Sequence, residues 1–415
     1  MKRTALSPAR SLQSLTPVEV AVGLRHLPGL VFFDTAGNVP SSYGNPVSII
    51  AADPRELLKG SIHCQDDREK LQDVLSKNAG EPMADRGFPL GGLCGWVDYE
   101  GEFVFGDYPE MLVHTDDGGW HEIGDLSRRI SNEAVKDEYE IGEVRASWNR
   151  ERFVSAVERI QEWIAAGDIY QVNVSQRFEA EVRGGSLFGL YQILRGASPS
   201  PMGSWLSLDG REVMSSSPET FLRISGRGIE TRPIKGTRPR YADSTADRRS
   251  AYELQTSPKE IAELVMITDL LRNDLGQVCE FGSVSVDEML QLETLEQVHH
   301  LVSTVSGRLR KDCGAVAALA ACFPGGSITG APKGRAMEII VELERAPRGL
   351  YCGAIGYLGY NGESQFNIAI RTMVRQGESL KFHAGAGIVA DSDPEKEYEE
   401  TLHKVAGIQM ALGKA

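Results

Sequence analysis

The chain lacks the features that mark three large classes of protein. It has no excess of basic residues, because 58 Asp and Glu outnumber 44 Lys and Arg and the formal net charge is -14. A general nucleic-acid-binding protein needs a basic patch to neutralise phosphates, so the charge argues against that class. No uninterrupted apolar run reaches membrane-spanning length, and the first residues contain no apolar signal core. We therefore expect a cytoplasmic protein that binds neither nucleic acid nor a membrane.

Paired cysteines are also lacking. The chain has six cysteines, and none of them forms a C-x-x-C pair, so a zinc site is not expected. In a cytoplasmic protein these cysteines are expected to be free thiols. The six are Cys64, Cys94, Cys279, Cys313, Cys322 and Cys352.

Two glycine-rich segments lack the complete signatures of nucleotide sites. Residues 325–333 contain Ala331-Pro332 where a P-loop needs Gly-Lys-Ser/Thr directly after its spacer. Residues 383–388 lack the full dinucleotide-binding fingerprint. What both segments offer is backbone N–H groups, together with the Thr329 hydroxyl, which could hold a carboxylate.

No low-complexity linker or internal repeat divides the 415 residues, and the weakest seam is the polar region 116–148. We predict an N-terminal region, 1–148, that contributes to the sheet core, and a region 149–415 that carries the site, the two forming one compact unit. Short strand-like segments at 30–33 and 46–50 and a Gly-rich segment at 91–96 indicate antiparallel sheet. Helices and strands do not alternate regularly, which favours an α+β fold with helices packed outside the sheets.

A helix and a strand are predicted directly after the seam. Phe153, Val157, Ile160 and Ile164 recur at helical spacing, and Gly167 is a plausible stop. In the strand that follows, Tyr170, Val172 and Val174 form an apolar face, while Gln171 points to the other side. From the pattern alone, Gln171 faces either a polar cavity or solvent.

Lys235 is the most informative single residue. It lies in the segment 232–237, flanked by Pro233 and Gly236 on an expected rigid turn, and Glu219 precedes it by sixteen positions. A lysine whose site lowers its pKa can act as a nucleophile, and a nearby carboxylate can act as its proton donor. The alternative is a surface lysine in a hairpin.

Two predicted helices each carry a pair of glutamates three positions apart. Ser257-Pro258 begins the first helix, which carries Glu260 and Glu263, and Asp393-Pro394 begins the second, which carries Glu397, Glu400 and, one turn on, Lys404. Two such pairs can form an all-oxygen Mg²⁺ site. The alternatives are a capping box in the first helix and a solvated salt-bridge face in the second. Arg371, on a strand-like segment, suits either bidentate carboxylate binding or a structural ion pair.

Taken together, these segments are similar to the chorismate-utilising enzymes, a family that includes anthranilate synthase, aminodeoxychorismate synthase, isochorismate synthase and salicylate synthase. The similarity is dense from about residue 150 onward and looser before it. It rests on an ordered set of motifs at residues 167–173, 217–219, 233–237, 268–275, 300–303, 326–333, 370–372, 385–389 and 393–397.

The resemblance implies the anthranilate synthase component I-like fold, which has two stacked antiparallel β-sheets with the site between them. It also implies Mg²⁺ as cofactor, bound directly by Glu263 and Glu397, with Glu260 and Glu400 nearby. His300 is expected to line the site near the ring, as a third catalytic residue beside Lys235 and Glu219. The residues expected to bind chorismate are Gln171, Thr329, Tyr357, Arg371, Gly385, Ala386, Gly387 and Lys404.

Three positions discriminate within the family. Enzymes that add water resemble each other in a lysine base where this chain has Gln171, which argues against isochorismate and salicylate synthase. Aminodeoxychorismate synthases typically carry lysine at the position of Lys235, where anthranilate synthases usually carry alanine. Residues 30–36 depart from the Leu-Leu-Glu-Ser element of tryptophan-inhibited anthranilate synthases, so this feedback inhibition is expected to be absent.

The resemblance therefore implies a transferase, aminodeoxychorismate synthase component I, that converts chorismate and ammonia into 4-amino-4-deoxychorismate for p-aminobenzoate and folate synthesis. The nearest alternative is anthranilate synthase component I, which forms anthranilate and pyruvate for tryptophan synthesis. None of the six cysteines lies in a Gly-x-Cys-x-Gly nucleophile turn, so a separate glutamine amidotransferase subunit is expected to supply the ammonia. A non-catalytic anion-binding module is a further alternative, and the failed P-loop spacing argues against it.

Overall fold

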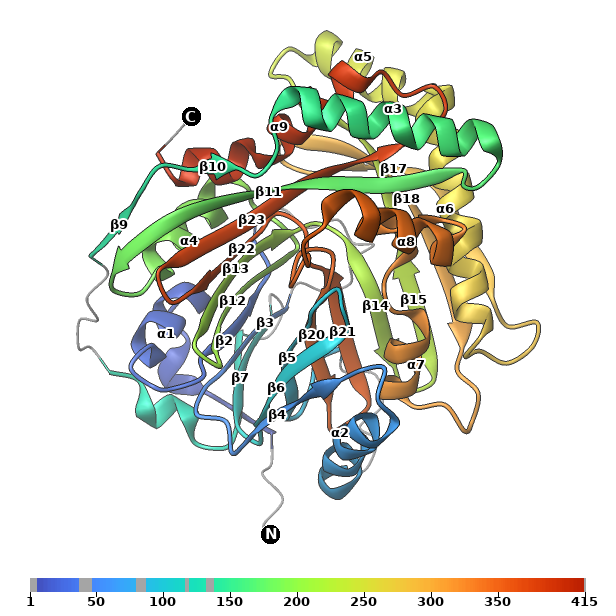
Figure 1. Cartoon of the computed structure of the whole chain (residues 1–415). Coiled ribbons are helices and arrows are strands. Elements are labelled where there is room, and N and C mark those ends of the chain that lie inside the picture. The colour runs from blue at the N-terminus through green and yellow to red at the C-terminus, as the bar shows by residue number, and fades with distance from the viewer. Residues whose placement is uncertain (1–5, 37–46, 80–86, 116–118, 132–137, 414–415) are drawn as a thin grey trace.

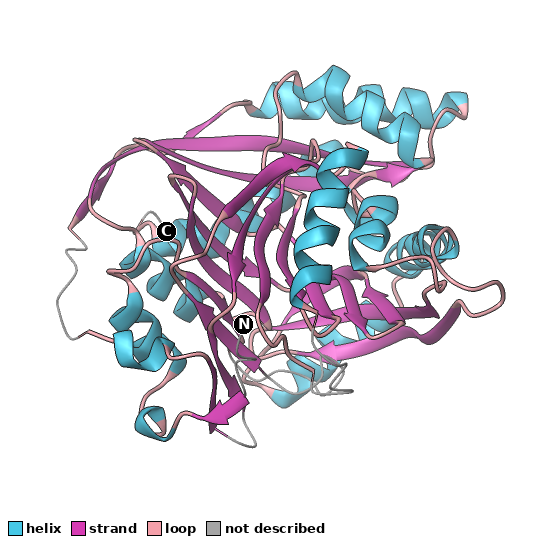
Figure 2. Ribbon diagram, turned by 90° about the horizontal axis from the view of Figure 1, so that it is seen from below, coloured by secondary structure: helices cyan, strands magenta, loops and turns pink. Residues whose placement is uncertain are grey.

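A computed structural model describes residues 6–36, 47–79, 87–115, 119–131 and 138–413. In this part of the chain two antiparallel β-sheets form the body of the molecule and helices pack around their outer faces (Figures 1 and 2). The predicted α+β class with two sheets is therefore confirmed. Part of the predicted seam, residues 116–118 and 132–137, and the first residue of the segment 46–50 lie outside the described residues.

The first sheet has 13 strands in the described residues and the second has ten. The first contains β1 (Leu6–Pro8), β2 (Val31–Asp34), β3 (Val47–Ala51), β7 (Met111–Thr115), β8 (Gly119–Ile123), β9 (Tyr139–Ile141), β10 (Arg145–Ala146), β11 (Gln171–Gly184), β12 (Met202–Leu208), β13 (Arg211–Ser217), β19 (Gly330–Ala331), β22 (Thr372–Gln376) and β23 (Ser379–Ile388). The second contains β4 (Leu57–Ser61), β5 (Gly92–Val97), β6 (Glu102–Tyr108), β14 (Thr220–Ser225), β15 (Gly228–Arg232), β16 (Ile234–Pro239), β17 (Ser285–Thr294), β18 (Val298–Arg308), β20 (Ala354–Gly359) and β21 (Glu363–Ile368).

The helices of the described residues are α1 (Pro17–Leu24), α2 (Gln65–Asn78), α3 (Arg150–Ala166), α4 (Phe188–Ala197), α5 (Ser244–Gln255), α6 (Pro258–Gly276), α7 (Ala315–Cys322), α8 (Lys333–Glu344) and α9 (Pro394–Ala411). Short 3₁₀ turns are η1 (Arg10–Leu12), η3 (Leu126–Arg129) and η4 (Gly326–Ile328). None of these helices is long and apolar enough to cross a membrane. All six cysteines are free thiols, as predicted.

One hydrophobic core lies between the two sheets and two larger ones lie on their outer faces under the helices, and strand alternation explains how all three form. In β2, Val31 packs into this central cluster while Phe32 packs on the opposite face, under α1 and α4. In β5, Cys94 faces the centre and Leu93 faces the cluster on the outer side of the second sheet. Strands from both predicted regions pair in both sheets, since β2 pairs with β12 and β5 pairs with β20.

The helix and the strand predicted after residue 148 are both present. Helix α3 ends at Ala166, and Gly167 adopts the left-handed conformation of a C-cap with φ +84°. Val172 and Val174 of β11 are buried against α3 and α8. Tyr170 was predicted to share their buried face, and that prediction was wrong, because Tyr170 precedes the strand and its side chain is exposed. Gln171 is buried, which rules out the solvent-facing alternative.

The two glutamate-bearing helices begin where the sequence predicted. The Ser257 side chain accepts a hydrogen bond from the backbone N–H of Glu260, and the Asp393 side chain accepts from those of Glu395 and Lys396. Each helix has proline in its first turn. Lys259 in the first turn of α6 pairs with Glu397 in the first turn of α9, so the two helix starts face each other.

Lys235 does not lie on a rigid turn, and that prediction was wrong. It belongs to β16, which pairs with β18 along the edge of the second sheet. The pairing register shifts between Lys235 and Thr237, at a β-bulge where Gly236 has φ +74°. A Cβ atom at Gly236 would lie 2.6 Å from the Leu254 side chain, so both the backbone conformation and the space require glycine here.

Candidate active site

A cavity of about 860 Å³ is lined by parts of β11, β16, β18 and β23, by the first two turns of α6, by α9 along most of its length, and by the loops between them. Its volume falls in the range of small-molecule sites. It brings together Glu219, Lys235, Glu260, Glu263, His300, Arg371, Gly385, Gly387, Glu397, Glu400 and Lys404, all of which the sequence singled out. Gln171 reaches its edge, where its amide donates to Glu263.

Glu219 lies in the connection between β13 and β14 and is 5% exposed. Burial raises the pKa of its carboxyl to about 7, although a hydrogen bond from Ser327 and the charges of Lys235 and Lys404 act in the opposite direction. The backbone holds the residue in place, because the Glu219 carbonyl accepts from the N–H of Ile368 at 3.0 Å. A carboxyl that is partly protonated at neutral pH suits a general acid.

The Lys235 amine faces the same cavity from β16. Its Nζ lies 4.0 Å from Glu263 Oε2, and the side chain is largely buried. On the opposite wall, a Cβ atom at Gly387 would lie 3.3 Å from Lys235 Nζ and 2.4 Å from Gln171 Nε2. Glycine at position 387 therefore leaves the room that these two side chains occupy.

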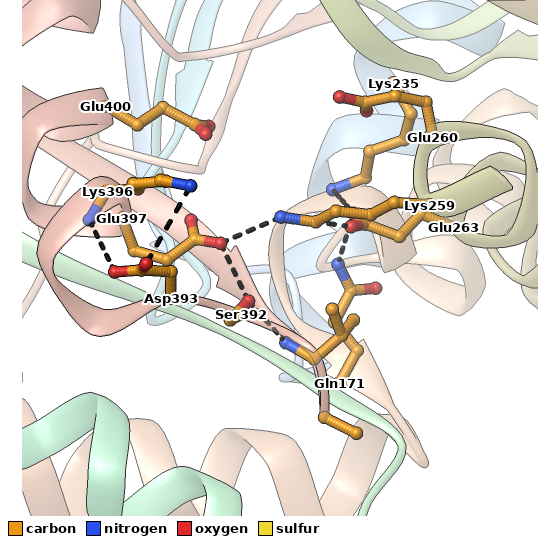
Figure 3. A network of polar contacts seen from close by, with 12 residues as sticks. Gln171, Lys235, Lys259, Glu260, Glu263, Ser392, Asp393, Lys396, Glu397 and Glu400 are labelled. Atoms are coloured by element: carbon orange, nitrogen blue, oxygen red, sulfur yellow. Dashed lines mark hydrogen bonds and ion pairs between the residues drawn. The ribbon is translucent and has the colours of Figure 1, made fainter. Parts of the chain in front are cut away.

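Glu263 and Glu397 face each other across the starts of α6 and α9 (Figure 3). Both are buried, and burial raises the pKa of the Glu263 carboxyl despite the nearby Lys235 and Lys259. The Lys259 ammonium lies between them, 2.9 Å from Glu397 Oε1 and 4.0 Å from Glu263 Oε1. Ser392 also donates to Glu397 at 2.7 Å.

The other two predicted ligands have partners of their own. Glu260 is 3.7 Å from Arg238, and Glu400 is 2.6 Å from Lys404. In the described residues, no group of three or more His, Cys, Asp or Glu side chains converges closely enough to hold a metal ion. Mg²⁺ needs only one or two direct carboxylates, with water and substrate oxygens completing its shell. Two buried carboxylates that face a cation and line an open cavity fit that requirement.

His300 lies on β18 and contributes a neutral imidazole. Burial and the charge of Arg371 lower its pKa to about 3. Its Nδ1 is 3.0 Å from Thr237 Oγ1, and its buried Nε2 has no hydrogen-bond partner among the described residues. Arg371 lines the same cavity, with a left-handed backbone at φ +50°. His300 and Arg371 thus offer one neutral and one cationic group to a ligand.

Three of the residues predicted to bind chorismate do not present their side chains to the cavity. The Thr329 hydroxyl donates to the carbonyls of Gly325 and Gly326, and this residue does not line the cavity. Tyr357 packs in the central core, where its ring lies against Phe33. The Ala386 side chain is buried on the opposite face of β23, so only its backbone is near the cavity.

The cavity residues that sequence reasoning missed include four with polar side chains. Tyr351 precedes Tyr357 in the same segment and stacks on His383. Ser327 lies two positions before Thr329. The sequence alone offers no reason to choose one of the two tyrosines, or one of the two hydroxyls, as the residue that lines the cavity. Asn173 shares the face of Gln171 at strand spacing, which was an available signal, and its buried Nδ2 has no hydrogen-bond partner in the described residues. No sequence pattern marks Lys259 as a cavity residue, because its partner Glu397 comes from a different helix, α9.

Comparison with known proteins identifies the class. The family model described as "chorismate binding enzyme" matches residues 110–410. Component 1 of anthranilate synthase from Methanothermobacter thermautotrophicus is 40% identical over 350 residues, covering 79% of this chain and 75% of that protein. Component 1 of aminodeoxychorismate synthase from Klebsiella aerogenes is 48% identical over 268 residues, covering 65% of this chain and 59% of that protein.

Solved structures agree on the fold. Anthranilate synthase component I from Streptococcus pneumoniae superposes with a TM-score of 0.76 at 29% identity, covering 89% of this chain and 94% of that chain. A menaquinone-specific isochorismate synthase from Escherichia coli gives a TM-score of 0.77 at 17% identity, which shows the fold alone. The fold and the cavity thus define an enzyme of small-molecule metabolism. The chain belongs to the chorismate binding enzyme family, and it is a chorismate-utilising enzyme.

Proposed function

We propose that this protein is component I of aminodeoxychorismate synthase and forms 4-amino-4-deoxychorismate from chorismate and ammonia. The observation that carries the proposal is the position of Lys235. Its amine faces the cavity of a chorismate-utilising enzyme together with Glu219, whose pKa is raised to about 7. A lysine nucleophile beside a carboxylic acid is the arrangement that covalent catalysis with acid assistance needs.

In the first step, Lys235 gives its ammonium proton to solvent, and the resulting neutral amine attacks ring C2 of chorismate. A C–N bond forms, the two ring double bonds shift by one position, and the C4–O bond breaks. Protonated Glu219 gives its proton to the departing hydroxyl, which leaves as water. The product of this step is a covalent adduct on Lys235, and Glu219 is left as a carboxylate.

In the second step, ammonia adds at C4 and the double bonds shift back. The C2–N bond to Lys235 breaks, and the Glu219 carboxylate accepts the proton that the incoming amine loses. Lys235 leaves as a neutral amine and takes up a proton from solvent, so both groups return to their starting states. The neutral imidazole of His300 presents an unpaired buried Nε2 to the cavity, which suits hydrogen bonding to the ring substituents.

Glu263 and Glu397 are the residues that would hold Mg²⁺. When bound, Mg²⁺ supplies positive charge that anchors and neutralises the ring carboxylate. The second carboxylate of chorismate is then available to Arg371 and to the backbone beside Gly385. Lys404 supports this wall, because its ammonium donates to the Gly385 carbonyl at 2.9 Å.

Ammonia is expected to come from a separate glutamine amidotransferase subunit. The name of the Klebsiella aerogenes relative, component 1, implies a second component of that enzyme. A partner of this kind would release ammonia close to the cavity, and free ammonium salts would replace it in the test tube. The product serves p-aminobenzoate and folate synthesis under this proposal.

Anthranilate synthase component I is the second candidate. It is favoured by the Methanothermobacter thermautotrophicus relative, whose 40% identity extends over 79% of this chain. The same cavity would hold chorismate, but amination and loss of pyruvate would replace the covalent step on Lys235.

One experiment separates the two candidates. The purified chain is incubated with chorismate, Mg²⁺ and ammonium at mildly alkaline pH, and the products are resolved by mass. Aminodeoxychorismate, which a lyase converts into p-aminobenzoate, is the expected result. Anthranilate with pyruvate would overturn the proposal in favour of the second candidate, while the fold and the family would stand.

A further inference from the structure

The Lys259 ammonium lies in the position where the proposed metal site needs positive charge. Its Nζ is 2.9 Å from Glu397 Oε1 and 4.0 Å from Glu263 Oε1, so one cation spans the two carboxylates (Figure 3). Both carboxylates are buried and would repel each other if they were charged and unscreened. Lys259 therefore stabilises the arrangement of α6 and α9 when no metal is present.

The location of Lys259 on its helix is unfavourable for a cation. It lies in the first turn of α6, where the helix dipole favours negative charge, and the charge there is balanced by Glu397 from another helix. The side chain is 40% exposed at the mouth of the cavity. A lysine held by one strong partner, with solvent beside it, can leave that partner at little steric cost.

Mg²⁺ and the ammonium cannot share this position. A metal ion held by Glu263 and Glu397 would lie between the same two carboxylates as the ammonium, and like charges a few ångströms apart repel strongly in a partly buried site. We infer, on the basis of the proposed metal site, that Lys259 is an internal counter-ion to Glu263 and Glu397. It joins Glu263 to Glu397 in the metal-free enzyme and swings to solvent when Mg²⁺ binds. Metal affinity is then set by competition with a residue of the chain itself.

The neighbouring lysines provide the controls. Lys235 is 4.0 Å from Glu263 but faces the reaction centre, so it is unsuitable as a control. Lys396 is on the same helix as Glu397, and its ammonium is 3.9 Å from Asp393 with 81% of the side chain exposed. Lys396→Met removes the same charge near the same helix start without touching either proposed ligand.

The test is calorimetric titration of MgCl₂ into the full chain without chorismate, comparing wild type, Lys259→Met and Lys396→Met. Removing the competing cation is expected to tighten Mg²⁺ binding in Lys259→Met about tenfold. Lys396→Met is expected to stay within about twofold of wild type, because exposed pairs contribute little. Equal or weaker binding by Lys259→Met would overturn the inference.

Thermal unfolding provides a second readout that needs no catalysis. In EDTA, Lys259→Met is expected to melt below wild type, because two buried carboxylates lose their counter-ion. Saturating Mg²⁺ is expected to raise its Tm more than that of wild type and to close the difference. Lys259→Gln, which keeps the length and removes the charge, is measured in parallel in case the methionine variant does not fold without metal. A difference in Tm that persists unchanged in Mg²⁺ would contradict displacement.

The failure of this inference and the failure of the proposed function give different results. If wild type binds Mg²⁺ and Lys259→Met binds it no better, only the counter-ion role fails. If no variant binds Mg²⁺, the metal site fails and the inference with it, while product analysis still decides which reaction the enzyme performs.

Discussion

The Lys235 amine lies 4.0 Å from the Glu263 carboxylate, across the edge between β16 and α6. This contact joins the two halves of the site, since Lys235 is the proposed nucleophile and Glu263 a proposed metal ligand. A substrate carboxylate anchored near Glu263 would bring its ring close to the amine. The predictions below test the two halves separately.

Lys235→Ala is expected to lower aminodeoxychorismate formation at least about 100-fold, because the covalent route loses its nucleophile. Chorismate binding is expected to change far less, and it is measured by calorimetry without ammonia. Mass spectrometry of the wild type quenched during turnover is expected to detect a chorismate-derived adduct on Lys235. Full activity in the alanine variant would show that the reaction does not pass through this lysine.

Glu219→Gln is expected to change how stability depends on pH. The folded pKa of about 7 lies above the ordinary 4.5, so between these values the folded state holds more protons than the unfolded state. Stability contributed by this group therefore falls as pH rises through that window, by up to on the order of 3 kcal/mol. Replacing Glu219 by glutamine removes this contribution to the pH dependence of stability, because the glutamine side chain does not titrate.

Urea unfolding at pH 4.5 and pH 8 checks this prediction. The glutamine variant is expected to gain stability relative to wild type at pH 8 and to lose that advantage at pH 4.5. Its aminodeoxychorismate formation is expected to be at least about 100-fold slower, because it can neither donate nor accept the proton. Identical pH dependence in both proteins would mean that Glu219 is not held protonated by its burial.

Glu397→Gln is expected to weaken Mg²⁺ binding and chorismate binding together, because one proposed ligand is lost and the anchored carboxylate loses its cation. We expect each dissociation constant to rise about tenfold or more. Glu395→Gln is the matched control, since Glu395 lies in the same helical turn but is half exposed and pairs with Arg150. Loss of chorismate affinity without any change in Mg²⁺ affinity would assign Glu397 directly to substrate binding.

Asn173→Ala is expected to raise the dissociation constant of chorismate about tenfold, because a buried amide without a protein partner loses its ligand. Gln176 provides the control. It lies on the opposite face of β11 and donates to Thr401 at 2.8 Å, so Gln176→Ala is expected to lower stability without changing chorismate affinity. Unchanged affinity in Asn173→Ala would show that the amide is satisfied by water.

Much of the local structure was readable from the sequence because its causes are local. The Ser257 and Asp393 caps, the proline in each first turn and the Gly167 stop act within one helical turn. Spacing of three positions likewise placed Glu260 with Glu263, and Glu397 with Glu400, on shared helix faces. These features needed no knowledge of the rest of the chain.

The sequence alone determined the family, the start of each glutamate-bearing helix and the residue types that meet at the site. The tertiary structure alone decided which members of each motif face the cavity, because distant strands and helices set that choice. It selected Tyr351 over Tyr357 and Ser327 over Thr329, and placed Lys235 on a bulged strand rather than a turn. It also brought Lys259 to Glu397, a contact between two helices that no local pattern encodes.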